Sequence, residues 1–95
     1  MYGTICRLKV APGKMDDFKE YVREYEGVGL AGHVWTHVYQ ADTDPNEFWL
    51  AVAFEDAHSY KANAEDPAQH ERYVKMRSLL ASDPEWHDGT LVESM

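Results

Sequence analysis

The stretch HVWTHVYQADTDPNEFWLAVAFE, residues 33–55, decides the fold. Its first part, 33–40, alternates aromatic or imidazole groups with other residues, and its last part, 47–55, is a nearly continuous apolar run. Both parts have the length and pattern of β-strands. The segment between them, 41–46, is rich in Asp, Pro and Asn, which favour turns. The stretch therefore predicts a β-hairpin centred near Asp44.

The alternation along this hairpin divides its side chains between two faces. One face is apolar and would continue onto the strand expected at 2–10; we assign it to the side covered by helices. Its members are Cys6, Leu8, Val10, Val34, Thr36, Val38, Phe48, Leu50, Val52 and Phe54. The other face would point away from the helices, and its members are His33, Trp35, His37, Tyr39, Trp49, Ala51 and Ala53.

The hairpin register places large residues of this second face opposite small ones. Tyr39 should lie opposite Trp49, His37 opposite Ala51, and Trp35 opposite Ala53, a pattern that packs well against another sheet. We also expect His33 to face Glu55 as an ion pair.

Three interpretations of this aromatic face stay open. The interpretation we favour is an interface between two copies of the chain, formed by Trp35, His37, Tyr39 and Trp49. The face could instead line a ligand cavity at an interface, or place His37 for catalysis. A shared metal is excluded, because His33 and His37 lie about 13 Å apart along one strand, whereas two imidazoles on one zinc each need a bond of about 2 Å.

The chain before the hairpin reads as a strand and a helix. Residues 2–10 alternate as a strand does, and Pro12-Gly13 ends them. Residues 14–26 carry apolar side chains at helical spacing. The glycines within 27–32 predict a loop that leads into the hairpin.

The chain after the hairpin predicts a helix broken in two. Asp56 suits the cap of a short helix over 57–64. Asp66 and Pro67 suit the start of a second helix, which we expect to reach Leu80. Its inward stripe would be Gln69, Tyr73, Met76 and Leu80.

The end of the chain predicts a turn and a strand. Pro84 ends the helical region, Asp88-Gly89 predicts a turn, and 90–94 predicts a last strand. Trp86 would anchor that turn. The order is then βαββαβ with a split second helix, which most simply forms a four-stranded antiparallel sheet with helices on one face, the ferredoxin-like α+β arrangement.

Composition limits the classes of partner. The 95 residues are enough for one small domain spanning 1–95, and domains of this size often gain stability by pairing with a copy. The 17 acidic residues against 9 basic ones give a net charge of −8, which disfavours nucleic acid and anionic membranes as partners. Cys6, the single cysteine, excludes an intrachain disulfide and a cysteine-based zinc cluster.

The start of the chain bears on localisation. Met1 leads straight into a strand-like run, and no apolar segment nears the roughly 20 residues that span a bilayer. We therefore expect a cytoplasmic protein without a signal peptide.

Several segments resemble the antibiotic biosynthesis monooxygenase-like family. They are YQADTDPNEFWLAVAFED (39–56), YKANAEDPAQHERY (60–73), PEWHDG (84–89) and the PGK before the first helix. The resemblance covers nearly the whole chain. It implies a homodimeric α/β-barrel in which two ferredoxin-like sheets face each other, with a ligand cleft between each sheet and its own helices.

The resemblance carries over only part of the family's known chemistry. Quinone-forming members, which oxidise polycyclic phenols without metal or flavin, carry Asn and Trp on the third strand, Tyr on the next helix and His near the end of the second strand. The matching positions are Leu50, Phe54, Tyr60 and Gln40, so only Tyr60 has the family's residue type.

Haem-degrading members of the family use an Asn, a Trp and an axial His. The matching positions are Cys6, Asn63, and Arg72 or Tyr73, while His70 lies on a different helix face. None of these positions has the expected residue type.

Tyr60 and Asn63 are the candidate catalytic pair, because residues three apart on a helix share a face. Tyr60 could donate a hydrogen bond to a phenolic substrate that Asn63 orients; alternatively, Tyr60 is a core tyrosine whose hydroxyl reaches the rim. The cleft floor would consist of Cys6, Val38, Leu50, Phe54 and Tyr73. Cys6 itself should be an inert buried thiol.

The sequence thus predicts a homodimer that binds a small apolar or aromatic molecule, with no cofactor and no metal. It could be a cofactor-independent monooxygenase in which the substrate anion itself reduces dioxygen. A non-catalytic binding or stress-response barrel is the first alternative. A haem-binding or haem-degrading protein that uses His70 is the second.

Overall fold

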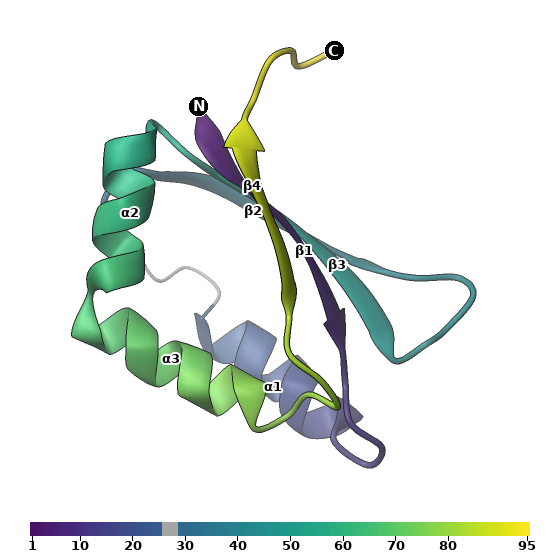
Figure 1. The fold of residues 1–95 in the computed structure, drawn as a ribbon. Helices are drawn as coiled ribbons and strands as arrows, with labels where there is room; N and C mark the ends of the chain where they lie inside the picture. Colours follow the sequence, from purple (N-terminus) through teal and green to yellow (C-terminus); the bar gives the residue numbers. More distant parts are fainter. Residues whose placement is uncertain (26–28) are drawn as a thin grey trace.

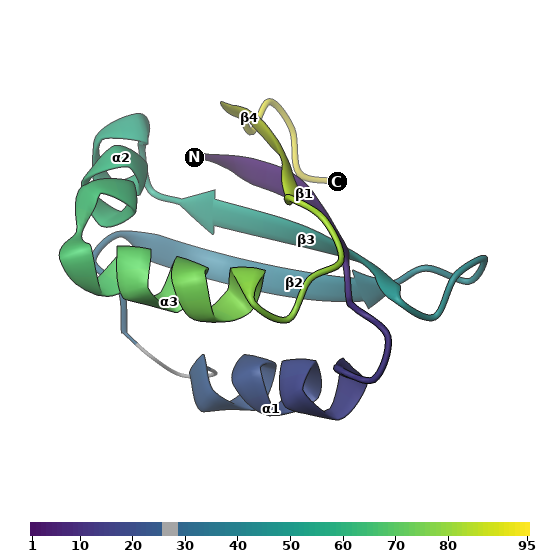
Figure 2. The ribbon, with the colours of Figure 1, turned by 60° about the horizontal axis from the view of Figure 1, so that its bottom comes forward.

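The computed structural model describes residues 1–25 and 29–95 of the chain. The elements follow in the order β1 (Tyr2–Lys9), α1 (Met15–Tyr25), β2 (His33–Gln40), β3 (Glu47–Phe54), α2 (Ala57–Glu65), α3 (Pro67–Arg77) and β4 (Glu85–Thr90). The strands form one antiparallel sheet in the order β2-β3-β1-β4. The helices lie on one side of it, as Figures 1 and 2 show. The predicted ferredoxin-like α+β fold is confirmed.

The predicted hairpin forms, and its register is confirmed where the aromatic residues lie. Trp35 pairs with Ala53, His37 with Ala51, and Tyr39 with Trp49. The turn is held by Asp44, whose Oδ1 accepts a hydrogen bond from the Asn46 amide at 2.9 Å. An aspartate that bonds the backbone two residues on is the turn chemistry that this segment predicted.

The predicted ion pair between His33 and Glu55 is wrong, because β2 contains a bulge. The register shifts between His33 and Trp35, so that His33 pairs with Phe54. A bulge of one residue moves the side chain before it to the other face of the sheet. The His33 ring accordingly packs edge-on against the Phe54 ring at 5.5 Å, and its Nε2 lies 2.7 Å from Thr36 Oγ1.

The helix starts agree with their capping residues. The Asp56 carboxylate accepts the Ser59 amide at 2.7 Å, and Asp66 accepts the Ala68 amide at 2.8 Å, ahead of Pro67 in the first turn of α3. Helix α3 ends at Arg77 rather than at the predicted Leu80, which instead bridges to Val10. The predicted end of the first helix at Glu26, and Gly27 of the predicted loop, lie outside the described residues.

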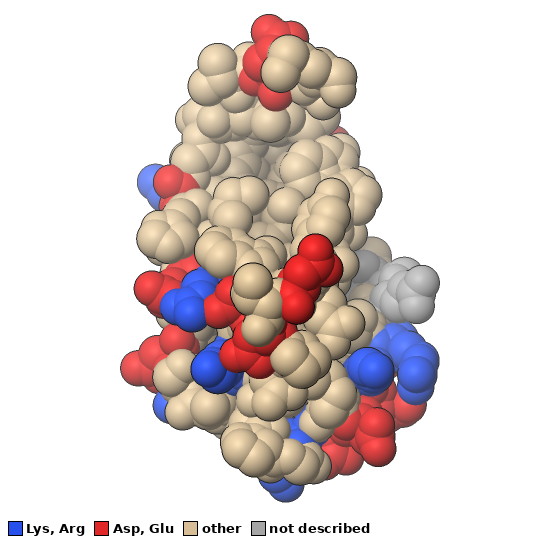
Figure 3. Space-filling model, turned by 90° about the vertical axis from the view of Figure 1, so that its right-hand side faces the viewer, with Lys and Arg blue, Asp and Glu red and all other residues tan. Residues whose placement is uncertain are grey.

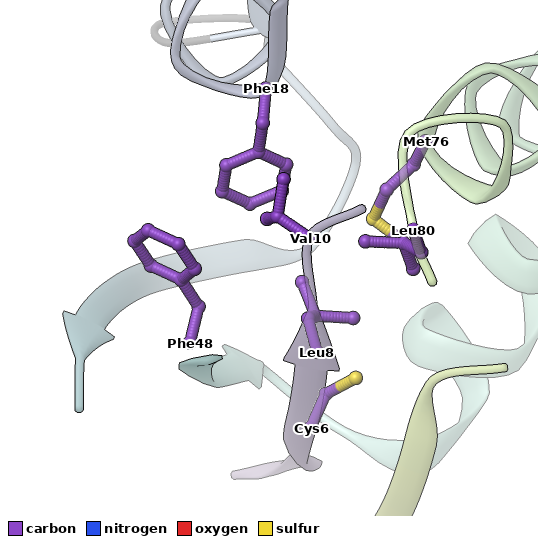
Figure 4. Packing of buried hydrophobic residues seen from close by; sticks show 7 residues of the cluster. All are labelled: Cys6, Leu8, Val10, Phe18, Phe48, Met76 and Leu80. Carbon is purple, nitrogen blue, oxygen red and sulfur yellow. The ribbon is translucent and has the colours of Figure 1, made fainter. Parts of the chain in front are cut away.

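The core lies between β1, β3 and the inward faces of α1 and α3 (Figure 4). Its buried side chains are Cys6, Leu8, Val10, Phe18, Phe48, Met76 and Leu80. Phe18 of α1 meets Phe48 of β3 with their ring centroids 4.9 Å apart. Tyr73, on the predicted inward stripe of α3, packs against the same cluster. The core therefore fills the helix side of the sheet along the second half of β1.

The last strand is β4, over Glu85–Thr90, so the predicted turn at 88–89 and the predicted strand at 90–94 are wrong. Pairing with β1 sets this outcome: Arg7 lies opposite Glu85, and Tyr2 opposite Thr90. The Asp-Gly turn signal is a local preference, and the ladder of hydrogen bonds to β1 outweighs it. Gly89 sits opposite Gly3 in that ladder.

No helix in the described parts of the chain is long and apolar enough to cross a membrane. Among residues 1–25 and 29–95, no three His, Cys, Asp or Glu side chains converge as metal ligands would.

Candidate functional site

Tyr60 is positioned by the cap of α2 and by two aromatic neighbours. The Asp56 cap fixes the first turn of α2, which carries Tyr60 near its end. The Tyr60 ring packs edge-on against Tyr2 of β1 at 5.3 Å and against Phe54 of β3 at 5.6 Å. Such edge-to-face contacts stabilise aromatic pairs beyond the area they bury. The phenol is thus held against the sheet, with its hydroxyl directed towards β4.

The Tyr60 hydroxyl donates a hydrogen bond to Asp88 Oδ1 at 2.9 Å. Burial of the ring, the hydrogen bond to Asp88 and the negative charge of Asp88 together raise the pKa of Tyr60 to about 12. Tyr60 therefore stays protonated at neutral pH, where it acts as a donor. Asp88 accepts this hydrogen bond with one of its two carboxylate oxygens.

Thr4 lies directly across from Asp88 in the β1–β4 ladder. Its hydroxyl is buried, with 5% of the residue exposed, and no hydrogen bond reaches Oγ1 from the described residues. Thr4 lies near enough to the Tyr60 phenol to oppose part of the rise in its pKa. The geometry between the two hydroxyls falls short of a hydrogen bond, although the Tyr60 hydroxyl is the polar group beside Thr4 Oγ1. A buried hydroxyl without a full hydrogen bond costs up to about 1–3 kcal/mol, and the nearby phenol offsets part of that cost.

Cys6 is fully buried one pair further along the same ladder, opposite Trp86. Burial, together with the negative charges of Asp88 and Glu85, raises the pKa of its thiol to about 12. The neutral thiol is a poor nucleophile, because the thiolate is the reactive form. The predicted inert thiol is confirmed, and Cys6 offers no surface of its own to a ligand.

The other predicted floor residues lie on the helix side but at different places. Phe54 is buried beneath Tyr60, whereas Leu50 and Tyr73 pack against the core. Val38 lies opposite Leu50 and is 41% exposed, because β2 is an edge strand. Of this set, the structure brings Phe54 into contact with Tyr60.

Asn63 lines a different surface from Tyr60. It borders a hollow of about 430 Å³ between residues 29–31 and the corner where α2 meets α3, together with His58, Asp66 and Arg72. Tyr60 is not among the residues that line this hollow. The two predicted catalytic residues therefore share a helix but point into separate environments.

The predicted interface residues Trp35, His37, Tyr39 and Trp49 all lie on the side of the sheet that the helices leave bare. Trp35 and His37 stack at 5.1 Å, and Tyr39 and Trp49 are exposed. A shallow hollow of about 170 Å³ opens on this outer face, where Gly3, Ala53 and Gly89 leave room. Figure 3 looks onto this side and shows uncharged surface around the hollow in its upper half, with Asp, Glu, Lys and Arg side chains gathered below it.

Sequence reasoning missed Thr4 and Asp88 as neighbours of Tyr60. Reading 85–90 as a strand would have placed Trp86 and Asp88 on one face, two residues apart. The buried Pro84 directly before them, and the alternation of EWHDGT, were the available signals. The burial of a lone hydroxyl such as that of Thr4 has no signal in the sequence.

Comparison with known proteins identifies the family of this chain. The family model described as antibiotic biosynthesis monooxygenase matches residues 1–75. No curated protein matches the chain. Among solved structures, a protein assigned to the same monooxygenases, from Chloroflexus aurantiacus, is 25% identical with a TM-score of 0.79, over 99% of this chain and 95% of the other.

Two more distant structures share the fold. One is assigned to the same monooxygenases in Deinococcus radiodurans, at 11% identity and a TM-score of 0.83, over 100% of this chain and 96% of that one. The other is a variant of SnoaB, a cofactor-independent oxygenase from Streptomyces nogalater. It is 12% identical with a TM-score of 0.85, over 99% of this chain and 95% of that one.

Proposed function

The chain belongs to the antibiotic biosynthesis monooxygenase family, and on that premise we propose that it oxidises a small phenol or quinol with dioxygen, without a cofactor. SnoaB, whose fold this chain shares, is a cofactor-independent oxygenase, which supports the proposal. In this chemistry the substrate anion supplies the electrons that reduce dioxygen. For a substrate with a reactive CH₂ group, such as an anthrone, one oxygen atom becomes the new carbonyl and the other leaves as water with both hydrogens.

The observation that carries the proposal is the hydrogen bond from Tyr60 to Asp88 Oδ1, which leaves Asp88 Oδ2 without a hydrogen-bond partner among the described residues. The Tyr60 ring packs against the aromatic rings of Tyr2 and Phe54. A site of this kind excludes water from an aromatic substrate while it offers hydrogen bonds to a substrate hydroxyl. The protein's role is then to bind, orient and desolvate, because the substrate performs the reduction itself.

The proposed assembly is a homodimer in which the bare outer faces of two sheets meet. Ile5 lines a hollow there whose lining contains no Lys, Arg, Asp or Glu. Tyr39 and Trp49 expose large rings further along the same face, where Trp49 lies opposite Arg7. Exposed apolar surface of this kind on a small domain marks an interaction site. Pairing by the same face on both copies gives a closed, two-fold dimer.

Tyr60→Phe is expected to lower quinone formation about tenfold, since the variant loses the hydroxyl that holds Asp88 in place. The measurement is dioxygen uptake with product spectra, by metal-stripped protein, across anthrones, hydroquinones and related phenols. Tyr25→Phe is the matched control, because its ring packs on α1 and no hydrogen bond of its hydroxyl is found among the described residues. Uptake no greater than in protein-free buffer for the whole panel would remove the enzyme proposal and leave a binding role.

Trp49→Asp is expected to convert the dimer into monomers, because it would place two carboxylates in an apolar contact. Sedimentation velocity over a range of protein concentrations measures this change. Val74→Asp, an equally drastic change at an exposed site on α3, should leave the dimer intact. A native chain that sediments as a monomer at all concentrations would contradict the proposed assembly.

A further inference from the structure

The hollow beside Asn63 lies where residues 29–31 come close to the junction of α2 and α3. Its volume of about 430 Å³ falls within the range of about 300–1,000 Å³ that small-molecule sites occupy. Leu30 and Ala62 give it apolar walls, while Asn63 and Arg72 bring polar groups to it. Figure 2 shows the beginning of β2 and the junction of the two helices at the same end of the molecule. The hollow is therefore built from parts of the chain that are far apart in the sequence.

Arg72 differs from the other arginines of the chain in its partners. Arg7, Arg23 and Arg77 each form a salt bridge with a carboxylate. Arg72 forms none with the described residues, although the chain has 17 acidic residues against 9 basic ones. Its side chain is half-buried and lines the hollow. The positive charge of Arg72 is therefore available to a ligand in the hollow.

Three contacts hold Arg72 in position. Its Nη1 donates a hydrogen bond to Gln69 Oε1, one turn earlier on α3, at 3.0 Å. Its guanidinium carbon lies 5.8 Å from the centre of the Tyr25 ring, within the range of a cation–π contact. Its backbone carbonyl accepts the Tyr21 hydroxyl at 3.2 Å. Because a guanidinium has several N–H donors in a rigid fork, most of them stay available beyond the one that Gln69 accepts.

A carboxylate suits this guanidinium, because its two oxygens match the fork of N–H donors. The Asn63 side chain forms no hydrogen bond with the described residues, and its amide can donate to the same group. The apolar walls favour a compact hydrocarbon body on the ligand. Asp66 lines the hollow as well, with one carboxylate oxygen bound to the Ala68 amide. Its negative charge opposes a second acidic group on the ligand.

We propose that Arg72 and Asn63 bind small monocarboxylates in this hollow, with the hydrocarbon body of the ligand against Leu30 and Ala62. Tyr60 does not line the hollow, so the site does not rest on the proposed oxidation of phenols. The net charge of −8 disfavours anions on the protein as a whole. A carboxylate that binds this chain therefore reports a local cationic site.

Calorimetric titration with matched probes tests whether the charge of the ligand is recognised. Valerate carries a carboxylate, valeramide replaces it with an uncharged amide, and glutarate replaces the terminal methyl group of valerate with a second carboxylate. In a buffer free of phosphate and carboxylates, the native protein is expected to bind valerate about tenfold more tightly than valeramide, a difference of about 1.4 kcal/mol. Glutarate should bind more weakly than valerate, because Asp66 repels its second charge. Equal affinities for valerate and valeramide, or no binding of valerate at millimolar concentration, would overturn the proposal.

Variants of Arg72 test the contact with the carboxylate. Arg72→Gln should weaken valerate about tenfold and leave valeramide nearly unchanged, since glutamine keeps a donor but carries no charge. Arg72→Lys should restore part of the affinity, because it keeps the charge without the fork. Arg23→Gln removes the same charge from an exposed site on α1 and should change neither affinity. A folded Arg72→Gln variant that binds valerate as tightly as the native protein would contradict the proposal.

Ala62→Leu tests the place of the ligand without a change of charge, and it does so even if Arg72→Gln does not fold. Ala62 is exposed and lines the hollow, so a larger side chain there should obstruct the ligand and weaken valerate severalfold. Ala64→Leu is the matched control, because Ala64 is exposed on the same helix but does not line the hollow. Both variants keep a good helix former, so their Tm should stay close to that of the native protein. Equal valerate affinities in the two variants would show that the ligand lies elsewhere.

Amide chemical shifts locate the bound carboxylate independently of affinity. Valerate should move the amides of 29–31 and 58–66 and leave those of 85–90 in place. Shifts confined to 2–6 and 85–90 would place the ligand beside Tyr60 and Asp88 and overturn the proposal. Failure of the proposed oxidation of phenols would leave this site intact, because no step of these titrations consumes dioxygen.

Discussion

Gly3→Ala is expected to destabilise the protein by at least about 3 kcal/mol, enough to leave much of a small domain unfolded. A Cβ at this position would overlap the backbone carbonyl oxygen of Val52 on β3. The obstacle is a strand of the central pair rather than a side chain that can rotate away. Relief would require β1 and β3 to separate where they pair along their full length. Glycine at position 3 is therefore required by the close approach of two strands.

Gly89→Ala supplies the matched control, because Gly89 is the direct partner of Gly3 in the β1–β4 ladder. No atom lies within 4 Å of the position that its Cβ would take. The free energy of unfolding should change by less than about 1 kcal/mol, since alanine restricts the unfolded chain without straining the folded one. Urea denaturation at one fixed protein concentration measures both variants. Equal losses in the two would show that the close approach to Val52 is not the cause.

Phe18→Ala is expected to cost about 3–5 kcal/mol of stability. Phe18 is 2% exposed and is a side chain of α1 that contacts β3, through the ring of Phe48. Its removal would leave a cavity that the surroundings cannot close, because Leu8 is held in the β1–β3 ladder and Val10 by its bridge to Leu80. The loss should appear as a lower denaturation midpoint with the same slope against urea.

Val74→Ala is the comparison for Phe18→Ala. Val74 is 53% exposed on α3, so its truncation removes little buried surface and should shift the free energy of unfolding by about 0.5 kcal/mol or less. A loss at Phe18 no larger than that at Val74 would mean that α1 adds little to the core.

Much of the fold could be predicted because local signals and tertiary packing agree. The capping residues Asp56 and Asp66 begin the helices that follow them, and the turn at 41–46 sets the register that pairs Trp35 with Ala53. In β4 they disagree. Asp88-Gly89 has turn chemistry, yet it lies in a strand because Gly3, at the other end of the chain, provides the pairing partner.

The candidate site shows the same limit. Tyr60 could be singled out from its helix and from the family resemblance, but its partner Asp88 belongs to the strand that was misplaced. The prediction that Asn63 acts with Tyr60 assumed that two residues three positions apart on a helix have the same surroundings. The sheet contacts Tyr60, whereas residues 29–31 approach Asn63. Which neighbour approaches each side of a helix is a tertiary property that helical spacing does not contain.

The bulge between His33 and Trp35 has a consequence for how copies of this chain avoid aggregating. It lies in β2, which is an edge strand of the sheet and so carries unpaired backbone groups. A bulge twists such an edge and interrupts the regular spacing that a further strand would need for pairing. The opposite edge, β4, is short and bears Glu85 and Asp88, which repel an identical strand. Growth strand by strand into fibres is thereby disfavoured at both edges, and contact between copies is left to the faces of the sheet.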